Sequence, residues 1–183
     1  SLTYEQLVAR TPIDVIGTAV DDGFLEGTNL SDRVFGGLGD DVLWGGEGDD
    51  HYVFNLGDGI DRIIDTVSET DGNVVQFGSG IHLSMIQLGI GPGFTLPGTS
   101  SLIVRIGTNG DEIRLANLDV EDVRGSETVR TFQFADGSSL SYAQLLDRGF
   151  DYLGSDGDDV LAGTSGIDRF ALSGGNDVME GRA

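Results

Sequence analysis

The chain has 183 residues, of which 31 are acidic and 10 basic, so its net charge is −21. It contains no lysine, and this excludes nucleic-acid binding, which needs a basic face to displace the counterions of phosphate; the same charge opposes docking on an anionic membrane. Because there is no cysteine, a disulfide framework and a thiolate zinc site are excluded as well.

The acids are mostly aspartate, 23 against 8 glutamates, and they accompany 30 glycines. Glutamate is the better helix former, whereas aspartate and glycine favour tight turns. Many short carboxylates on turns indicate a hard cation, since Ca²⁺ takes oxygen ligands and tolerates several carboxylates at once. The sequence has no GxSxG elbow, Walker loop or HExxH motif, so we predict that it is not an enzyme.

Residues 1–16 form the first segment, a short helix over residues 1–10 followed by a linker. The helix sequence SLTYEQLVAR is repeated as SLSYAQLLDR at residues 139–148, with six identities in ten. Both copies stand shortly before a glycine-rich stretch. We therefore expect residues 1–16 to be the tail of a preceding unit, in a parent protein that repeats the arrangement of this chain.

Residues 17–53 repeat with a period of nine. From Gly27 the units read GTNLSDRVF, GGLGDDVLW and GGEGDDHYV, with aspartate in the sixth place and an apolar or aromatic residue in the eighth. A degenerate copy, one residue longer, begins at Gly17 and puts Asp22 in the sixth place. This stretch, which carries nine acids against Arg33 alone, is the first repeat block.

Residues 54–153 have longer runs of alternating apolar and polar residues. Strands bounded by Gly, Asn or Asp are predicted at residues 72–78, 82–89, 101–107, 111–117 and 128–135. We expect these strands to form a small antiparallel β-sandwich that acts as a spacer or cap. A short helix with a glycine stop follows at residues 139–149.

The nine-residue period returns in residues 154–183. Units GSDGDDVLA and GTSGIDRFA start at Gly154, and LSGGNDVME follows from Leu172. The sequence stops where a further unit would begin. We therefore expect a second, truncated repeat block in a chain that is a piece of a longer array.

The period has a direct physical interpretation. The glycines take the positive φ angles of a tight turn, the sixth-place aspartate closes it, and a short strand follows whose eighth-place side chain points inward. Two units make one coil, so Asp32 faces Asp50 across one strand spacing of about 4.8 Å. A divalent cation between two such carboxylates, bound also by turn carbonyls, replaces their repulsion by attraction. Without the cation we expect the segment to stay open.

The unit GGxGxDxUx resembles the nonapeptide of the RTX (repeats-in-toxin) proteins. The resemblance is direct over residues 27–53 and 154–180, and the units that begin at Gly36 and Gly45 match every fixed position. It implies a parallel β-roll in which the first six residues of each unit bind Ca²⁺. Residues 50–150 are also similar to the haemolysin-type calcium-binding-related domain, which implies a capping or spacer role.

The RTX resemblance implies carboxylate ligands at the sixth places and carbonyl ligands within the turns. The carboxylates would be those of Asp32, Asp41, Asp50, Asp159, Asp168 and Asp177, with Asp22 as the partner of Asp41 in the degenerate copy. The carbonyls would be those of Gly37, Gly39, Gly46, Gly48, Gly157 and Gly166. The expected fold is thus all-β, a parallel β-roll flanking an antiparallel sandwich, with short helices at 1–10 and 139–149.

Several other polar residues are expected to have plainer roles. Asp58, Asp61 and Asp65 follow the first block but break its nine-residue register, so we expect solvated or strand-terminal carboxylates rather than metal ligands. His51 and His82 each stand without a second histidine nearby, and we expect neither to bind a metal.

Partners other than calcium stay open. The ninth-place residues Phe35, Trp44 and Val53 point outward, where they form either a patch for an unknown extracellular ligand or a face covered by the sandwich or the N-terminal helix. Because one coil has 18 residues, Phe35 and Val53 should share one outer face of the roll and Trp44 should lie on the other. The unpaired parallel edges of each block invite self-association.

The resemblance favours a calcium-binding module of a large secreted bacterial protein of the toxin or adhesin type, which folds when it meets extracellular Ca²⁺. Two alternatives stay open. One is an adhesive or ligand-binding tandem array, and the other is the C-terminal secretion and folding module of a secreted hydrolase.

Overall fold

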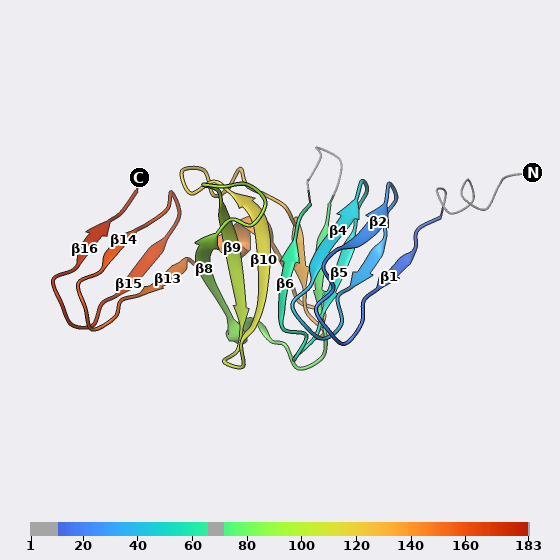
Figure 1. Ribbon diagram of the computed structural model, residues 1–183, viewed down its shortest axis with the longest axis horizontal. Coiled ribbons are helices and arrows are strands. Elements are labelled where there is room, and N and C mark those ends of the chain that lie inside the picture. Colours follow the sequence, from blue (N-terminus) through green and yellow to red (C-terminus); the bar gives the residue numbers. More distant parts are fainter. Residues whose placement is uncertain (1–10, 66–71, 183) are drawn as a thin grey trace, which may run out of the picture.

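The computed structural model describes residues 11–65 and 72–182, and it is nearly all β. The described part is elongated, with its strands side by side along the long axis and β1 (Asp14–Ile16) and β16 (Val178–Glu180) at opposite ends (Figure 1). The helix expected at residues 1–10 lies outside the described residues. Within the described ranges, no helix has both the length and the apolar character that crossing a membrane requires.

Two facing sheets start in the first repeat block. Strands alternate between them, and each strand pairs in parallel with the strand one coil away. One sheet begins with β1, β3 (Arg33–Phe35), β5 (His51–Phe54) and β7 (Val74–Phe77), and the other with β2 (Leu25–Thr28), β4 (Val42–Gly46) and β6 (Ile60–Ile63). Val34 pairs with Tyr52, and Leu25 with Leu43, each 18 residues apart. The predicted β-roll, with two units to a coil, is confirmed.

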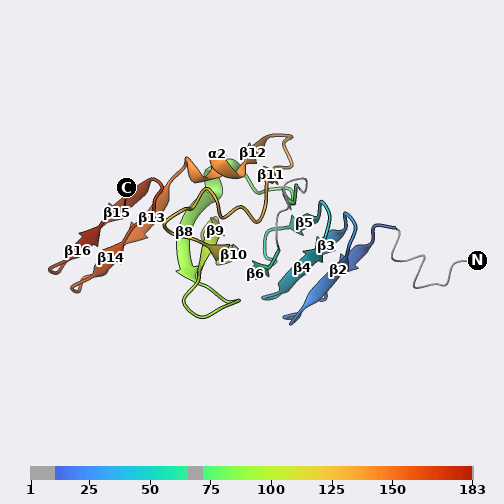
Figure 2. The ribbon, with the colours of Figure 1, turned by 90° about the horizontal axis from the view of Figure 1, so that it is seen from above.

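The segment after the first block extends the same two sheets. The antiparallel strands β8 (Ile86–Pro92), β9 (Ser100–Ile106) and β10 (Asp111–Leu118) join the sheet of β6, because β10 pairs in parallel with β6. The strands β11 (Thr131–Gln133) and β12 (Ser139–Ser141) join the sheet of β7 in the same way. The antiparallel pairs of β8, β9 and β10 agree with the expected sandwich, whereas β7 and β11 pair in parallel, and all these strands continue the two layers of the roll (Figure 2).

Several elements of this segment are shorter than predicted, including β7 (74–77 against 72–78) and β11 (131–133 against 128–135). A 3₁₀ turn, η1 (Leu83–Met85), replaces the start of the strand expected at residues 82–89. The helix expected at residues 139–149 is reduced to α2 (Tyr142–Leu146), because residues 139–141 pair with β11. Ser141 and Gln144 form a capping box at its start, in which each side chain accepts a hydrogen bond from the backbone N–H of the other.

One hydrophobic core fills the space between the two sheets. The eighth-place side chains of Val34, Leu43 and Tyr52 are 0%, 2% and 1% exposed, as strand alternation predicts. The same core continues into the middle segment, where the rings of Phe77 and Phe132 stack with centroids 6.5 Å apart. The repeats and the middle segment are therefore packed as one body.

The ninth-place side chains are half-buried, and the coil sorts them as predicted. Phe35 lies beside Val53 in one sheet, whereas Trp44 belongs to the other. The Trp44 ring contacts Phe24, with centroids 5.8 Å apart.

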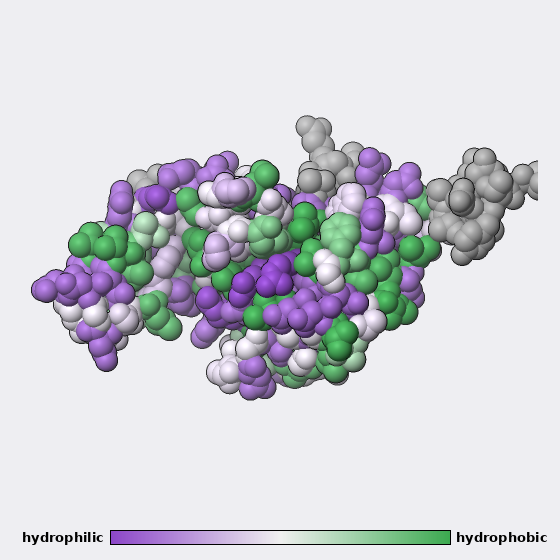
Figure 3. All heavy atoms as spheres, viewed as in Figure 1, coloured by the Kyte–Doolittle hydropathy of each residue, from purple (hydrophilic) through white to green (hydrophobic). Residues whose placement is uncertain are grey.

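The second repeat block forms two coils at the far end of the body. Here β13 (Phe150–Leu153) pairs with β15 (Asp168–Ala171), and β14 (Val160–Ala162) pairs with β16. One residue pair, Phe150 with Leu88, joins β13 to β8. The eighth-place Met179 is 52% exposed, and apolar surface is visible at this end (Figure 3). The core of this block is thus much less enclosed than that of the first.

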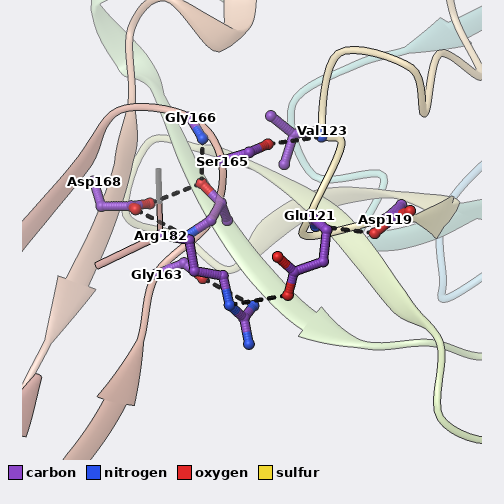
Figure 4. A network of polar contacts seen from close by, with 9 residues as sticks. Asp119, Glu121, Val123, Gly163, Ser165, Gly166, Asp168 and Arg182 are labelled. Carbon is purple, nitrogen blue, oxygen red and sulfur yellow. Dashed lines mark hydrogen bonds and ion pairs between the residues drawn. The ribbon is translucent and has the colours of Figure 1, made fainter. Parts of the chain in front are cut away.

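A polar network fixes the second block against the loop that follows β10 (Figure 4). The Val123 N–H donates to the Ser165 hydroxyl at 3.2 Å. Arg182 forms an ion pair with Glu121 at 3.1 Å and donates to the Gly163 carbonyl oxygen at 3.1 Å. These contacts supplement the short sheet junction between the two parts.

The close stacking of turns predicts that Gly46→Ala is strongly destabilising. Gly46 has a φ of 106°, and a β-carbon there would overlap the Thr28 carbonyl oxygen of the preceding coil. Left-handed strain and the clash together should lower the free energy of unfolding in Ca²⁺ by about 3 kcal/mol, as measured by urea denaturation. Gly57→Ala is the matched control, because Gly57 has a φ of 90° but no atom within 4 Å of the added carbon; it should cost only about 1 kcal/mol. Equal losses in the two variants would contradict the stacking argument.

Candidate metal site

Two columns of sixth-place side chains run along the roll, one for each row of turns. In each step the Oδ1 oxygen of one residue accepts a hydrogen bond from the backbone N–H of the sixth-place residue one coil before it. The distance is 2.8 Å from Asp32 N to Asp50 Oδ1 and 2.7 Å from Asp22 N to Asp41 Oδ1. The structure thus brings Asp32 together with Asp50, and Asp22 together with Asp41, as the period predicted.

The second carboxylate oxygen, Oδ2, has a partner in the units that begin with Gly-Thr or Gly-Ser. Asp32 Oδ2 accepts from the Thr28 N–H at 2.6 Å and from its hydroxyl at 2.7 Å. Asp159 Oδ2 accepts in the same way from the Ser155 N–H at 2.7 Å. These carboxylates are satisfied within their own turns.

In the units with glycine in the second place, Oδ2 has no such partner. The Oδ2 atoms of Asp41 and Asp50 are buried without a hydrogen bond, and so is that of Asp61. The three residues are 0%, 0% and 1% exposed. A buried carboxylate oxygen without a partner costs on the order of a few kcal/mol, which a bound cation would offset.

The first-place glycines leave the room that these oxygens need. A β-carbon on Gly36 would lie 2.5 Å from Asp41 Oδ2 and 3.0 Å from Asp61 Oδ2, so two partnerless oxygens converge on one point. A β-carbon on Gly45 would collide with Asp50 Oδ2. β-Carbons on the first-place glycines one coil earlier would overlap the carbonyl oxygens of Gly36 and Gly45. Carboxylate and carbonyl oxygens therefore line the same columns, as the ligand preference of Ca²⁺ requires.

Burial raises the pKa of all three of these carboxyls, because it penalises the charged form. It raises the pKa of Asp50 to about 7 and that of Asp61 to about 8, and the backbone hydrogen bond to each only partly opposes the rise. Burial raises the pKa of Asp41 in the same direction. Repulsion from other carboxylates adds to the effect in each case.

The turn glycines predicted as carbonyl donors differ between the two blocks. Gly37, Gly39, Gly46 and Gly48 have φ angles of 101°, 122°, 106° and 112°. Among the described residues, Gly157 and Gly166 are not in the group of glycines with positive φ. The turns of Gly157 and Gly166 therefore differ in backbone geometry from those of the first block, whereas the turn of Gly175, with a φ of 115°, resembles them.

The sixth-place aspartates of the second block are less enclosed than those of the first. Asp159, Asp168 and Asp177 are half-buried. The Asp159 N–H donates to Asp177 Oδ1 at 3.0 Å, and Asp168 Oδ2 accepts from the Thr164 N–H at 2.8 Å. Within residues 154–182, the structure has no buried carboxylate oxygen that lacks a partner. The need for a cation is thus strongest in the first block.

Asp58, Asp61 and Asp65 are 5%, 1% and 3% exposed, so they are not solvated as one half of the prediction had it. Asp58 and Asp65 stand just before and just after β6, as strand-terminal carboxylates would, whereas Asp61 lies within it. Asp61 occupies the sixth place of a further unit, and its Oδ1 accepts from the Asp41 N–H at 3.2 Å. Residues 57–63, GDGIDRI, keep the glycines, the aspartate and the apolar residue of the repeat. Two extra residues before this unit shift it out of the period, which is why counting in nines missed it.

A cation in the first block would be held mainly by one or two carboxylates and by main-chain carbonyl oxygens. Among residues 11–65 and 72–182, no group of three or more His, Cys, Asp or Glu side chains could hold a metal ion by itself. The oxygen-only columns, with partnerless Oδ2 atoms facing glycine, nevertheless fit Ca²⁺, for which carbonyls are ordinary ligands.

Comparison with known proteins agrees with this geometry. The RTX calcium-binding nonapeptide repeat (4 copies) matches residues 26–61 and 153–183, and the haemolysin-type calcium binding protein related domain matches residues 102–144. The comparison with curated proteins gave no match.

One similar solved structure is that of the extracellular lipase LipA from Serratia marcescens, with 20% sequence identity and a TM-score of 0.26. The match covers 94% of this chain and 25% of the lipase chain. This chain therefore spans only about a quarter of the length of that protein.

The raised pKa values predict that the metal-free protein loses stability as the pH rises. A carboxyl whose folded pKa lies above its unfolded value stabilises the fold below the unfolded value, and this contribution disappears as the pH rises through the folded pKa. For Asp50 and Asp61 the window runs from about pH 4 to about pH 8. In a chelator, the far-ultraviolet circular dichroism should therefore show more β signal at pH 5 than at pH 8. Asp61→Asn should reduce this difference, and a β signal that rises with pH in chelated wild-type protein would contradict the prediction.

Proposed function

Because this chain is an RTX calcium-binding nonapeptide-repeat protein that includes a haemolysin-type calcium binding protein related domain, we propose that it is a module whose first block folds when Ca²⁺ binds. Ca²⁺ is its cofactor. The observation that carries the proposal is the set of buried, partnerless Oδ2 oxygens on Asp41, Asp50 and Asp61. The proposed role of the module is calcium binding and structural support, without catalysis.

The physical basis is the balance of charge in the first block. Residues 17–53 carry nine acids against one arginine, and three of those aspartates are fully buried at the sixth places. In the metal-free chain, self-repulsion and the desolvation of these carboxylates oppose compaction. A bound Ca²⁺ reverses both effects, and because the site exists only in the folded chain, its binding free energy is folding free energy.

The switch suits a module of a large secreted bacterial protein of the toxin or adhesin type. Cytoplasmic Ca²⁺ is scarce, so the repeats would stay open inside the cell and fold outside it. The sequence of the parent protein on either side of this chain would distinguish a toxin from an adhesin or a secreted hydrolase.

Removal of Ca²⁺ is the first test of the proposal. We expect the far-ultraviolet circular dichroism of the full chain to lose most of its β signal in a chelator and to regain it in millimolar Ca²⁺. Isothermal titration calorimetry should show Ca²⁺ binding coupled to this change. An unchanged β signal after chelation would overturn the proposed function.

Single substitutions should identify the responsible carboxylates. Asp41→Asn keeps the hydrogen bond that Oδ1 accepts from Asp22 but removes the partnerless oxygen, so it should weaken Ca²⁺ binding at least tenfold, or about 1.4 kcal/mol. Asp136→Asn removes an equal charge from an exposed turn, where Ser138 is the partner, and is the matched control. Equal affinities in the two variants would count against the assignment.

A further inference from the structure

Asp65 stands in the first place of the coil that stacks on the unit of Asp50, one coil further along the roll. Leu43 pairs with Ile63 in the parallel ladder of β4 and β6, and the Ile64 N–H donates to the Leu43 carbonyl oxygen at 2.9 Å. Two residues further along each strand, Asp65 therefore lies over Gly45. An aspartate thus occupies a place that is glycine in the units at Gly17, Gly27, Gly36, Gly45, Gly154 and Gly163.

A side chain in the first place has to enter the polar interior of the turn. In the glycine units, an added β-carbon would fall at or within contact distance of Oδ2 of the sixth-place aspartate. Asp65 is 3% exposed, in agreement with an inward direction. Its carboxylate therefore lies where other coils hold the second oxygen of the sixth-place residue.

The sixth-place residue of the same coil is Asn73, and it cannot supply that second oxygen. Its Oδ1 accepts from the Asp50 N–H at 2.9 Å, as the aspartate Oδ1 atoms do in the other coils. Its Nδ2 donates to the Thr128 carbonyl oxygen at 3.3 Å. Asn73 thus keeps the hydrogen bond that stacks the coils but offers a cation an N–H₂ group in place of an oxygen.

A chain of contacts through Tyr52 and Gly45 links Asp65 to the partnerless oxygen of Asp50. The Tyr52 hydroxyl donates to Asp65 Oδ2 and accepts from the Gly45 N–H at 2.7 Å. Asp50 Oδ2 lies against Gly45 on the side of its missing β-carbon. Burial raises the pKa of Asp50, and among the neighbouring carboxylates Asp65 adds most to the rise. Two buried carboxylates therefore face the same turn.

We propose that Asp65 supplies the oxygen that Asn73 lacks, so that the last cation of the Asp50 column is bound between Asp50 and Asp65. Tyr52 is a positioning residue that fixes the Asp65 carboxylate. The inference rests on the proposed calcium-binding function and adds a ligand outside the repeat register. This assignment also explains how the Asp50 column can end in the neutral Asn73 and still bind an ion at its last step.

The test compares Ca²⁺ stoichiometry in the full chain by isothermal titration calorimetry. Asp65→Asn should lose one bound ion relative to wild type, or weaken one site at least tenfold, and leave the other sites unchanged. Asp111→Asn is the matched control, since Asp111 is also buried but accepts a hydrogen bond from the Gly57 N–H; it should bind the wild-type number of ions. Ca²⁺ should also shift the near-ultraviolet absorbance of wild type, in part by changing the Tyr52 hydrogen bond, and Tyr52→Phe should remove that part of the shift.

A double substitution keeps the proposal testable if Asp65→Asn fails to fold. Asp65→Gly combined with Asn73→Asp restores the residue types that the other coils have in these two places, so we expect a folded chain with the wild-type number of ions. A double variant that lacks one ion, or that does not fold in Ca²⁺, would overturn the proposal. So would an Asp65→Asn variant with wild-type stoichiometry and affinities. If Asp41→Asn still weakens binding in that case, the proposed function stands and only the role of Asp65 fails.

Discussion

A buried carboxylate oxygen without a hydrogen-bond donor is the constraint around which the first block is built. The Oδ1 atom of each stacked sixth-place aspartate accepts a hydrogen bond from a backbone N–H of the preceding coil, which fixes the spacing of the coils. Whether Oδ2 also has a hydrogen-bond donor then depends on the second residue of the unit. In the first block a threonine there satisfies it, whereas glycine leaves it open. In this block one residue per unit thus separates turns that satisfy their own carboxylate from turns that leave one of its oxygens without a donor.

The roll could be predicted from the sequence because its signal is a period. Regular spacing of aspartate and of eighth-place apolar residues determines both the turn and the inward face, and Val34 and Tyr52 pair as that spacing requires. The unit of Asp61 was missed because two extra residues break the period while its local pattern stays intact. Strict counting is thus less sensitive than the motif itself.

The arrangement of the middle segment was harder to predict, because it depends on pairing with the open strand edges of the roll and not on a pattern within its own sequence. Its strands show the expected alternation, but the sequence contains no signal that β10 pairs with β6 and β11 with β7. Those pairings join residues about 50 apart in the chain, and they depend on open strand edges that the roll provides. The burial of Asp65 is of the same kind, since only the ladder of β4 and β6 places it over Gly45.

The eight-stranded sheet that joins both blocks has a mechanical consequence. Its strands lie across the long axis, with β2 near one end and β15 near the other (Figure 1). A force along that axis would therefore pull neighbouring strands apart one pair at a time, rather than shear them all together. The junction of β13 with β8 rests on a single residue pair, whereas β8 and β9 are paired along seven residues. Under tension the second block would separate there first, and the longer ladders of β8, β9 and β10 would remain intact.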